Sequence, residues 1–281
     1  MRAYFEGWYL KHQSETDSLA LIPSCHYDKE GATVGSLQVI TPDWSQQVSF
    51  PGFHYRRKDR YFVLGDSSFS EQGCVLSLKT PELTLSGTLC YGPFVPPARD
   101  VMGPFRMLPF LQCRHSVFSL YHSVIGTVTV NGNRMVFDQG VGYMEGDRGR
   151  SFPKRYLWTQ CSWERDGIML SVADVPLWGL TITGCIGLVW LEGKVYRLAT
   201  YLGAKVIRVD ENRAVIRQGK LRLRVTALEK RSRPLLAPKR GSMARTIHES
   251  LTCTVRYQLY SGDEILLDRT SSLASFEGMW L

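Results

Sequence analysis

The stretch Ser123-Val-Ile-Gly-Thr-Val-Thr-Val-Asn-Gly-Asn-Arg-Met-Val-Phe137 predicts a β-hairpin. Apolar and polar residues alternate on both sides of Asn131-Gly132, as in strands with one buried face. An Asn-Gly pair accepts the positive φ angles that tight hairpin turns need. We therefore expect two antiparallel strands that meet near residues 130–135.

The same alternation recurs along most of the chain, in runs of about five to ten residues between turn signals. Examples are GATVGSLQVITP, CVLSLKT, LTLSGTLCY, GIMLSVADV, KLRLRV and LTCTVRYQLY. Helical periodicity is almost absent. The pattern favours an all-β protein built as sandwiches or barrels.

A weak internal repeat indicates two domains. Tyr4-Phe-Glu-Gly7 recurs as Tyr143-Met-Glu-Gly146, and Phe276-Glu-Gly278 follows near the end of the sequence. We predict an N-terminal β domain over 1–138 and a C-terminal β domain over 139–281. The proline-rich segment 92–110 lies between strand patterns, and we expect it to be a packed loop or lid.

The net charge of +8 comes entirely from the second half of the chain. Residues 1–139 hold 12 basic and 12 acidic residues, whereas residues 140–281 hold 22 and 14. The basic loop 230–245 has two interpretations, a solvated hairpin tip, which we favour, or a contact with phosphates of lipid or nucleic acid. We expect no nucleic-acid partner, keep a peripheral membrane contact open, and leave the oligomeric state undecided.

The N-terminal sequence has no signal-like apolar centre, so we expect a cytoplasmic protein. Seven cysteines without a CxxC pair predict reduced, mostly buried thiols. The uncharged run 175–191 is shorter than a spanning helix and is interrupted by Pro and Gly, which favours buried strands.

The stretch 142–163 gathers the candidate chemistry. In a strand over 156–161, Tyr156, Trp158 and Gln160 would share one face, and a preceding bend could bring Glu145 and Asp147 near it. A carboxyl against aromatic walls loses solvation and can hold a proton near neutrality, as a general acid does. The alternative is an ion network with Arg148, Arg150 or Arg155.

The stretch Cys113–His122 holds two histidines. His115 and Tyr121 share a face by parity, whereas His122 faces the other way unless a bulge intervenes. No carboxylate lies at ligand spacing in this stretch, so we predict no metal site. One histidine could transfer a proton, and the alternative is a half-buried ring bonded to a backbone carbonyl.

The stretch GYMEGDRGRSFPKRYLWTQC resembles the central motif of the tocopherol cyclase family. Tyr4–Lys11 is similar to the opening segment of that family, and the stretches 100–105 and 114–122 are similar to its middle. The resemblance implies tandem lipocalin-like β domains, a pocket for a prenylated or otherwise apolar ligand, and cyclisation of a phenol onto an alkene without a cofactor.

For that reaction, the resemblance implies that Glu145 or Asp147 donates the proton and that His115 orients or deprotonates the phenol. The remaining candidates are substrate-binding residues: Glu6, Trp8, His122, Tyr143, Arg148, Tyr156, Trp158 and Gln160. Arg148 stands where the family has an aromatic residue, which would favour an anionic head group. The second hypothesis is a non-catalytic carrier of an apolar molecule.

Overall fold

A computed structural model describes residues 3–27, 31–108, 111–177, 180–239 and 241–280. Antiparallel β-strands dominate these residues, and helical turns are confined to two short 3-10 segments, Gly103–Met107 and Thr200–Leu202. No helix among the described residues has the length and apolarity to cross a membrane. The predicted all-β class is confirmed.

The chain folds into two compact units. Unit 1 comprises residues 1–98, 115–151 and 235–246, and unit 2 comprises residues 99–114, 152–234 and 247–281. These units differ from the predicted division between residues 138 and 139. The physical reason is strand pairing, since Gly140–Gly149 pairs with Tyr4–Gln13 and therefore belongs to the sheet of unit 1.

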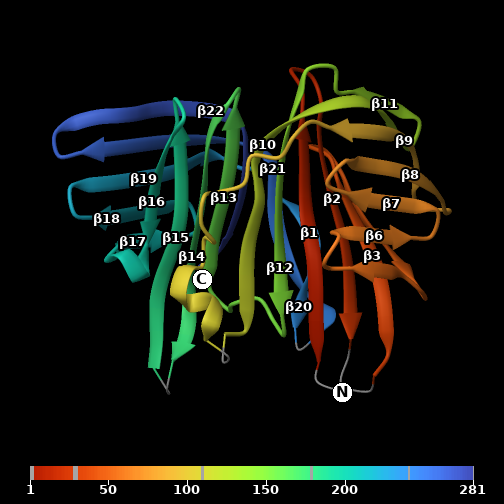
Figure 1. The fold of residues 1–281 in the computed structure, drawn as a ribbon, viewed down its shortest axis with the longest axis horizontal. Helices are drawn as coiled ribbons and strands as arrows, with labels where there is room; N and C mark the ends of the chain where they lie inside the picture. Colours follow the sequence, from red (N-terminus) through yellow and green to blue (C-terminus); the bar gives the residue numbers. More distant parts are fainter. Residues whose placement is uncertain (1–2, 28–30, 109–110, 178–179, 240, 281) are drawn as a thin grey trace. The chain divides into compact units, whose positions relative to one another are not determined.

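The sheet of unit 1 runs in the order β4-β3-β2-β1-β12-β10-β9-β8-β7-β6-β5, with β11 paired to β10 (Figure 1). Its strands among the described residues are β1 (Tyr4–Gln13), β2 (Ser18–Tyr27), β3 (Thr33–Ile40), β4 (Ser45–Phe50), β5 (His54–Arg56), β6 (Tyr61–Leu64), β7 (Ser67–Ser70), β8 (Gly73–Lys79), β9 (Thr84–Tyr91), β10 (Cys113–Val130), β11 (Asn133–Val136) and β12 (Gly140–Gly149).

One face of this sheet forms the apolar core of unit 1. The strand β1 contributes Trp8 and Leu10, and its neighbour β12 contributes Met144. The ring of Trp8 meets Tyr55 and Phe62 edge-on, at centroid distances of 5.8 and 5.5 Å. The sheet therefore curls until β5 and β6 reach β1, as in a lipocalin-like barrel.

The sheet of unit 2 runs in the order β16-β15-β14-β13-β22-β21-β19-β18-β17, with β20 paired to β21. Its strands among the described residues are β13 (Tyr156–Trp163), β14 (Asp166–Leu177), β15 (Leu180–Leu191), β16 (Lys194–Ala199), β17 (Lys205–Asp210), β18 (Arg213–Gln218), β19 (Leu221–Glu229), β20 (Arg233–Lys239), β21 (Ser242–Ser261) and β22 (Glu264–Met279). Leu157 and Cys161 of β13 point into its apolar core.

Several local predictions are confirmed. Val130 pairs with Asn133 across a turn in which Asn131 and Gly132 have φ angles of 50° and 84°. The described residues of the uncharged run, 175–177 and 180–191, belong to the paired strands β14 and β15 rather than to a spanning helix. All seven cysteines are among the described residues and are reduced, and Cys90 and Cys113 are the two that are not buried.

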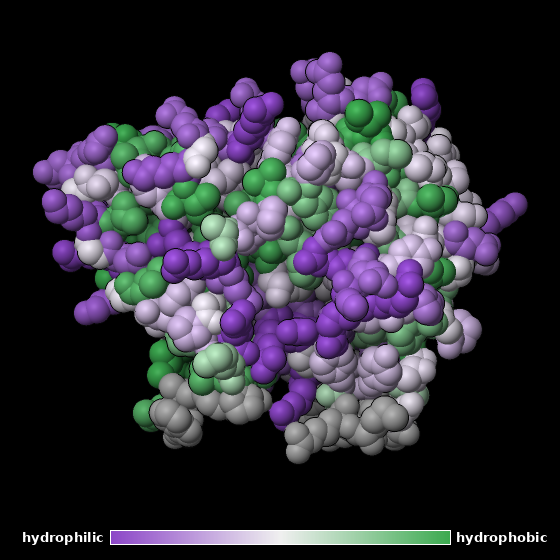
Figure 2. Space-filling model, viewed as in Figure 1, coloured by the Kyte–Doolittle hydropathy of each residue, from purple (hydrophilic) through white to green (hydrophobic). Residues whose placement is uncertain are grey.

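Two predicted loops have different outcomes. The segment 92–110 was expected to be a loop. Its described part, residues 92–108, contains no strand, as predicted. The basic segment 230–245 is not a solvated hairpin tip throughout, because β20 occupies its middle and buries Leu235 and Ala237. On the face drawn in Figure 2, hydrophilic side chains cover much of the surface, with hydrophobic ones scattered among them.

Candidate functional site

The strand β12 divides its side chains between two environments. Met144 points into the apolar core, and a Cβ atom on Gly146 would lie 2.7 Å from the ring of Phe118, which packs on the same core. By alternation, Tyr143, Glu145 and Asp147 point to the opposite face. We call this second face of β12, β1, β2 and β3 the polar face of unit 1.

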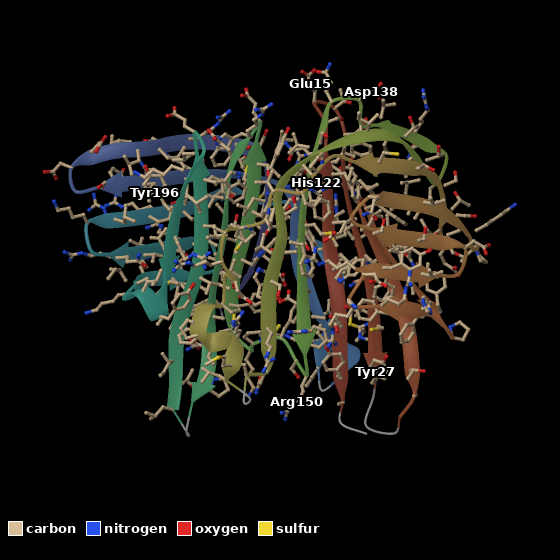
Figure 3. The ribbon with its side chains drawn as sticks, in the orientation of Figure 1. Glu15, Tyr27, His122, Asp138, Arg150 and Tyr196 are labelled. Carbon is tan, nitrogen blue, oxygen red and sulfur yellow. The ribbon has the colours of Figure 1, made fainter. Side chains whose placement is uncertain are left out.

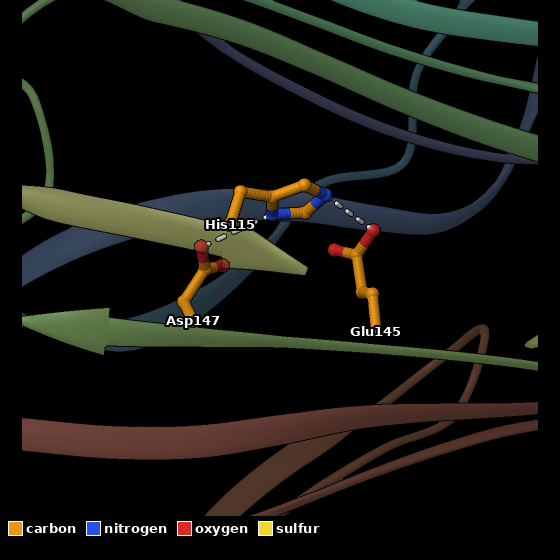
Figure 4. A group of neighbouring side chains, drawn as sticks. All are labelled: His115, Glu145 and Asp147. Atoms are coloured by element: carbon orange, nitrogen blue, oxygen red, sulfur yellow. Dashed lines mark hydrogen bonds and ion pairs between the residues drawn. The ribbon is translucent and has the colours of Figure 1, made fainter. Parts of the chain in front are cut away.

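On the polar face, one imidazole ring lies between two carboxylates (Figure 4). Nε2 of His115, from β10, is 3.2 Å from Oε2 of Glu145, and Nδ1 is 3.1 Å from Oδ1 of Asp147. The two acids come from alternate positions of β12, so the strand period places one at each end of the ring. The structure therefore joins the three residues that the sequence nominated as catalytic.

The carboxylates determine the charge of the ring. Burial by itself would lower the pKa of His115, but the charges of Glu145 and Asp147 outweigh it and hold that pKa well above its usual range. His115 is therefore an imidazolium at neutral pH. His115 thus contacts two acids rather than a backbone carbonyl. Of the arginines in the alternative ion network, Arg155 pairs with Asp174.

Tyr143 extends the group by one hydrogen bond. Its hydroxyl donates to Oε2 of Glu145 at 2.6 Å. Burial and the neighbouring Glu145 raise the pKa of Tyr143 well above its usual range, so the phenol keeps its proton. Tyr143, Glu145, His115 and Asp147 thus follow one another in a line of direct contacts, which we call the relay.

The two ends of the relay differ in exposure. The side chains of Glu145 and His115 are 6% and 10% exposed, whereas that of Asp147 is 24% exposed. Opposite Asp147 on β1 stands Gly7, which places no side chain beside the carboxylate. Asp147 is therefore the more exposed end of the relay.

The ligand atoms of His115, Glu145 and Asp147 lie within 4.8 Å of one another, a spacing that also suits a metal ion. In the described arrangement, however, the two carboxylates contact different nitrogens of one ring, whose lone pairs point in divergent directions. One ion can bind only one of these nitrogens. The geometry fits a carboxylate–imidazolium–carboxylate group better than a three-ligand metal centre.

Three predicted binding residues lie on the core face, away from the relay. Glu6 accepts hydrogen bonds from Tyr4 at 2.6 Å and Tyr55 at 2.5 Å, and forms an ion pair with Arg57. Arg148 stands opposite Glu6 in the strand register, and Trp8 is a core residue. Arg148, Glu6 and Trp8 therefore lie on the face of the sheet opposite Glu145, because their positions have the opposite parity.

His122 also lies apart from the relay, inside unit 1 (Figure 3). Its Nδ1 is 3.0 Å from the hydroxyl oxygen of Ser119, and its ring lies 4.6 Å from Phe94 and 4.8 Å from Tyr91. Burial and the neighbouring His12 lower the pKa of His122 to about 3. A Cβ atom on Gly142 would lie 2.1 Å from Nε2 of His122, so this glycine admits the ring.

Tyr156, Trp158 and Gln160 lie in unit 2, on the face of β13 opposite its core, as their parity predicted. All three are buried. Tyr156 donates a hydrogen bond to Glu277 of β22, and Nε2 of Gln160 donates to the hydroxyl of Ser162 at 2.8 Å. Glu277 was missed as a partner, although its Phe-Glu-Gly context was a usable signal.

On the polar face of unit 1, two buried residues were also missed. Tyr9 stands opposite Glu145, and Lys11 stands opposite Tyr143 in the register of β1 and β12. Lysine side chains are mostly exposed, so the residue pattern of β1 carries no signal for the burial of Lys11.

A sequence model described as tocopherol cyclase-like matches residues 82–278. The search of curated proteins by sequence found no match. The fold is similar to three solved structures that each align with nearly the whole chain. A putative AttH from Nitrosomonas europaea has a TM-score of 0.56 at 11% identity, covering 100% of this chain and 93% of its own.

Kievitone hydratase from Nectria haematococca has a TM-score of 0.55 at 9% identity, covering 99% of this chain and 89% of its own. CghA has a TM-score of 0.62 at 10% identity, covering 99% and 88%. At these identities the similarity establishes the lipocalin-like fold alone.

Proposed function

We propose that this chain, which belongs to the tocopherol cyclase-like family, catalyses the intramolecular addition of a phenolic hydroxyl to an alkene in a prenylated aromatic substrate. The same chemistry would serve a similar apolar substrate that carries a hydroxyl and a double bond. The reaction is an isomerisation, so it needs proton transfer and positioning but no net oxidation or reduction.

The relay is the observation that supports this proposal. The imidazolium of His115 is buried between two carboxylates and carries one exchangeable proton. Of the relay residues that contact this ring, Asp147 is the more exposed. Tyr143 and Glu145 stabilise the positive ring from the buried side. Such a group suits general acid–base catalysis, which typically contributes about 10²–10⁴-fold in rate.

The proposed step balances without a second reactant. His115 supplies a proton through Asp147 to one carbon of the alkene, and positive charge develops on the other carbon. The phenolic oxygen forms the new C–O bond as its O–H bond breaks, and this proton returns to Asp147 and His115. Product and substrate have the same composition.

The test uses hydroquinones that carry one prenyl chain, incubated with the wild-type chain and with the variant Glu145→Gln/Asp147→Asn. We expect the wild type to form a product of unchanged mass that has lost its alkene, measured by mass spectrometry and NMR. The double variant should bind the substrate and form no product.

Two other outcomes would replace the proposal. A product heavier by one water would identify a hydratase, with water as the nucleophile instead of the phenol. Binding without any product in the wild type would identify a carrier of apolar molecules, and neutralising the carboxyls would then change nothing but affinity.

A further inference from the structure

A second buried polar group lies on the polar face of unit 1. The hydroxyl oxygens of Ser24 on β2 and Ser36 on β3 are 2.7 Å apart, and Nε2 of His26 is 3.0 Å from each. The three side chains are almost fully buried, with exposures of 3%, 1% and 6%. We call Ser24, His26 and Ser36 the serine–histidine group.

One atom of this group has no partner. Nδ1 of His26 is buried and makes no hydrogen bond to any residue that the structure describes. A buried polar atom left unpaired costs about 1–3 kcal/mol, so native proteins rarely retain one. The partner that this nitrogen needs must come from outside the described chain.

The strand register connects this group to the relay. Asp147 stands opposite Gly7, Gly7 opposite Ser24, and Ser24 opposite Ser36. Residues opposite each other share a face, so Asp147 and the serine–histidine group lie on the same side of the sheet. With strands about 4.8 Å apart, the backbones at Asp147 and Ser24 are roughly 10 Å apart.

Gly7, which lies between them in the register, contributes no side chain of its own. A Cβ atom at this position would lie 3.0 Å from the Cβ of Ser24, so even an alanine would crowd the serine. An aromatic ring with an oxygen at each end is long enough to span such an interval with a hydrogen bond at both ends.

We propose that Ser24, His26 and Ser36 form a subsite that binds a neutral oxygen of the ligand, a hydroxyl or a carbonyl, at the end remote from Asp147. This inference rests on the proposed function, because it assigns the second polar contact of the same substrate. His26 is here a specificity-determining residue rather than a catalytic one.

The group's own chemistry selects a neutral oxygen. Burial lowers the pKa of His26 to about 4, so the ring is uncharged at neutral pH and offers no positive charge to a carboxylate or phosphate. A neutral imidazole has one donor and one acceptor nitrogen. When Nε2 accepts from a serine hydroxyl, Nδ1 carries the proton and donates to the ligand.

The experiment measures binding of two probes, a geranylated hydroquinone and the matching geranylated phenol that lacks the second hydroxyl. Dissociation constants are measured by tryptophan fluorescence in the Asp147→Asn background, so that neither probe is consumed. We expect this background to bind the hydroquinone about tenfold more tightly than the phenol, the effect of one hydrogen bond.

Three further variants in the same background isolate the nitrogen. His26→Gln places its amide near Nε2 and removes the polar atom at Nδ1, so it should bind both probes equally. His26→Asn keeps a polar atom near Nδ1 and should retain part of the preference. His12→Gln is the matched control, because His12 is also buried and neutral but both its nitrogens are bonded, to Leu19 and Tyr91; it should retain the full preference.

The outcomes separate this inference from the proposed function. The subsite would be overturned if the Asp147→Asn background bound both probes with equal affinity. It would also be overturned if adding His26→Gln weakened the binding of both probes by the same factor. Turnover by the wild-type chain could still stand in either case. A preference abolished by His26→Gln would support the subsite even if the wild-type chain formed no product. Failure of both probes to bind would overturn the subsite together with the substrate class.

Discussion

The motif Tyr-x-Glu-Gly occurs on two adjacent strands of unit 1 and has two different environments. In both copies the tyrosine hydroxyl donates to the glutamate two residues later at 2.6 Å, from Tyr4 to Glu6 and from Tyr143 to Glu145. Glu6 then pairs with Arg57, whereas Glu145 faces His115.

The two copies differ in the cation that pairs with the glutamate, which is Arg57 for Glu6 and His115 for Glu145. Arg57 keeps its proton at any physiological pH, and Glu6 raises its pKa further through their hydrogen bonds. His115 is charged because of its surroundings and can release its proton when they change. The same four residues therefore make a permanent ion pair on the core face and an exchangeable proton on the polar face.

The largest difference between the two copies is expected in the turnover rates of variants of their cations, His115 and Arg57. His115→Gln removes the titratable proton and should lower the turnover rate by about 10²–10⁴-fold, the usual contribution of acid–base catalysis. Arg57→Gln should leave the rate unchanged. Steady-state rates of both variants with a prenylated hydroquinone make the comparison, and equal losses would mean that the relay has no special role.

The second largest difference between His115 and Arg57 is expected in how the stability of their variants depends on pH. The pKa of His115 in the folded chain lies above its unfolded value of about 6.5. Its protonation therefore adds stability that is complete below about pH 6.5 and is lost as pH rises through the folded pKa. The stability difference between wild type and His115→Gln, measured by urea unfolding, should shrink toward alkaline pH.

Arg57 provides the control for that measurement, since it does not titrate in this range. The stability difference between wild type and Arg57→Gln should stay constant from neutral to alkaline pH. A difference for His115→Gln that grows with pH would contradict a raised pKa for His115.

Removing the tyrosine hydroxyls compares the copies more finely. Tyr143→Phe deletes one donor to Glu145 and should lower turnover by up to about tenfold, the value of one hydrogen bond of about 0.5–1.5 kcal/mol. Tyr4→Phe deletes the equivalent donor to Glu6 and should reduce the free energy of unfolding without changing turnover. Both variants are tested by measuring the turnover rate and the free energy of unfolding. A turnover loss in Tyr4→Phe, with unchanged turnover in Tyr143→Phe, would assign the catalytic role to the copy that contains Glu6.

The smallest effect is expected from the ion pair itself. Over half of the Arg57 side chain is exposed, and Tyr4 and Tyr55 still donate to Glu6 when the arginine is lost. Arg57→Gln should therefore reduce the free energy of unfolding by only about 1 kcal/mol. A loss several times larger would show that Glu6 depends on this charge more than its exposure implies.

Local features of the fold were predictable from neighbouring residues. The Asn131-Gly132 turn, the alternation in β13 and the reduced cysteines each follow from short-range patterns. His115, Glu145 and Asp147 were also nominated together, although their residue types alone left ion networks and carbonyl-bonded histidines as alternatives. What the sequence lacked was the register between strands.

The register explains why the sequence alone did not place these side chains. Shifting one strand against another by a single residue exchanges the faces of all its side chains. The pairing of Tyr9 with Glu145 sends Glu145 to the polar face, and it sends Glu6, Trp8 and Arg148 to the core face. The Ser24, His26 and Ser36 group was missed for the same reason, since it exists only when β2 and β3 are aligned.

The sequence by itself determined that this chain is all-β, where its tight turns lie and which residue types carry its chemistry, because these depend on alternation and on turn residues within a few positions. Tertiary structure alone decided which glutamate meets a histidine and which meets an arginine. Those partners come from residues 30 to 51 positions away, and hydrogen bonding between strands fixes the face on which they meet.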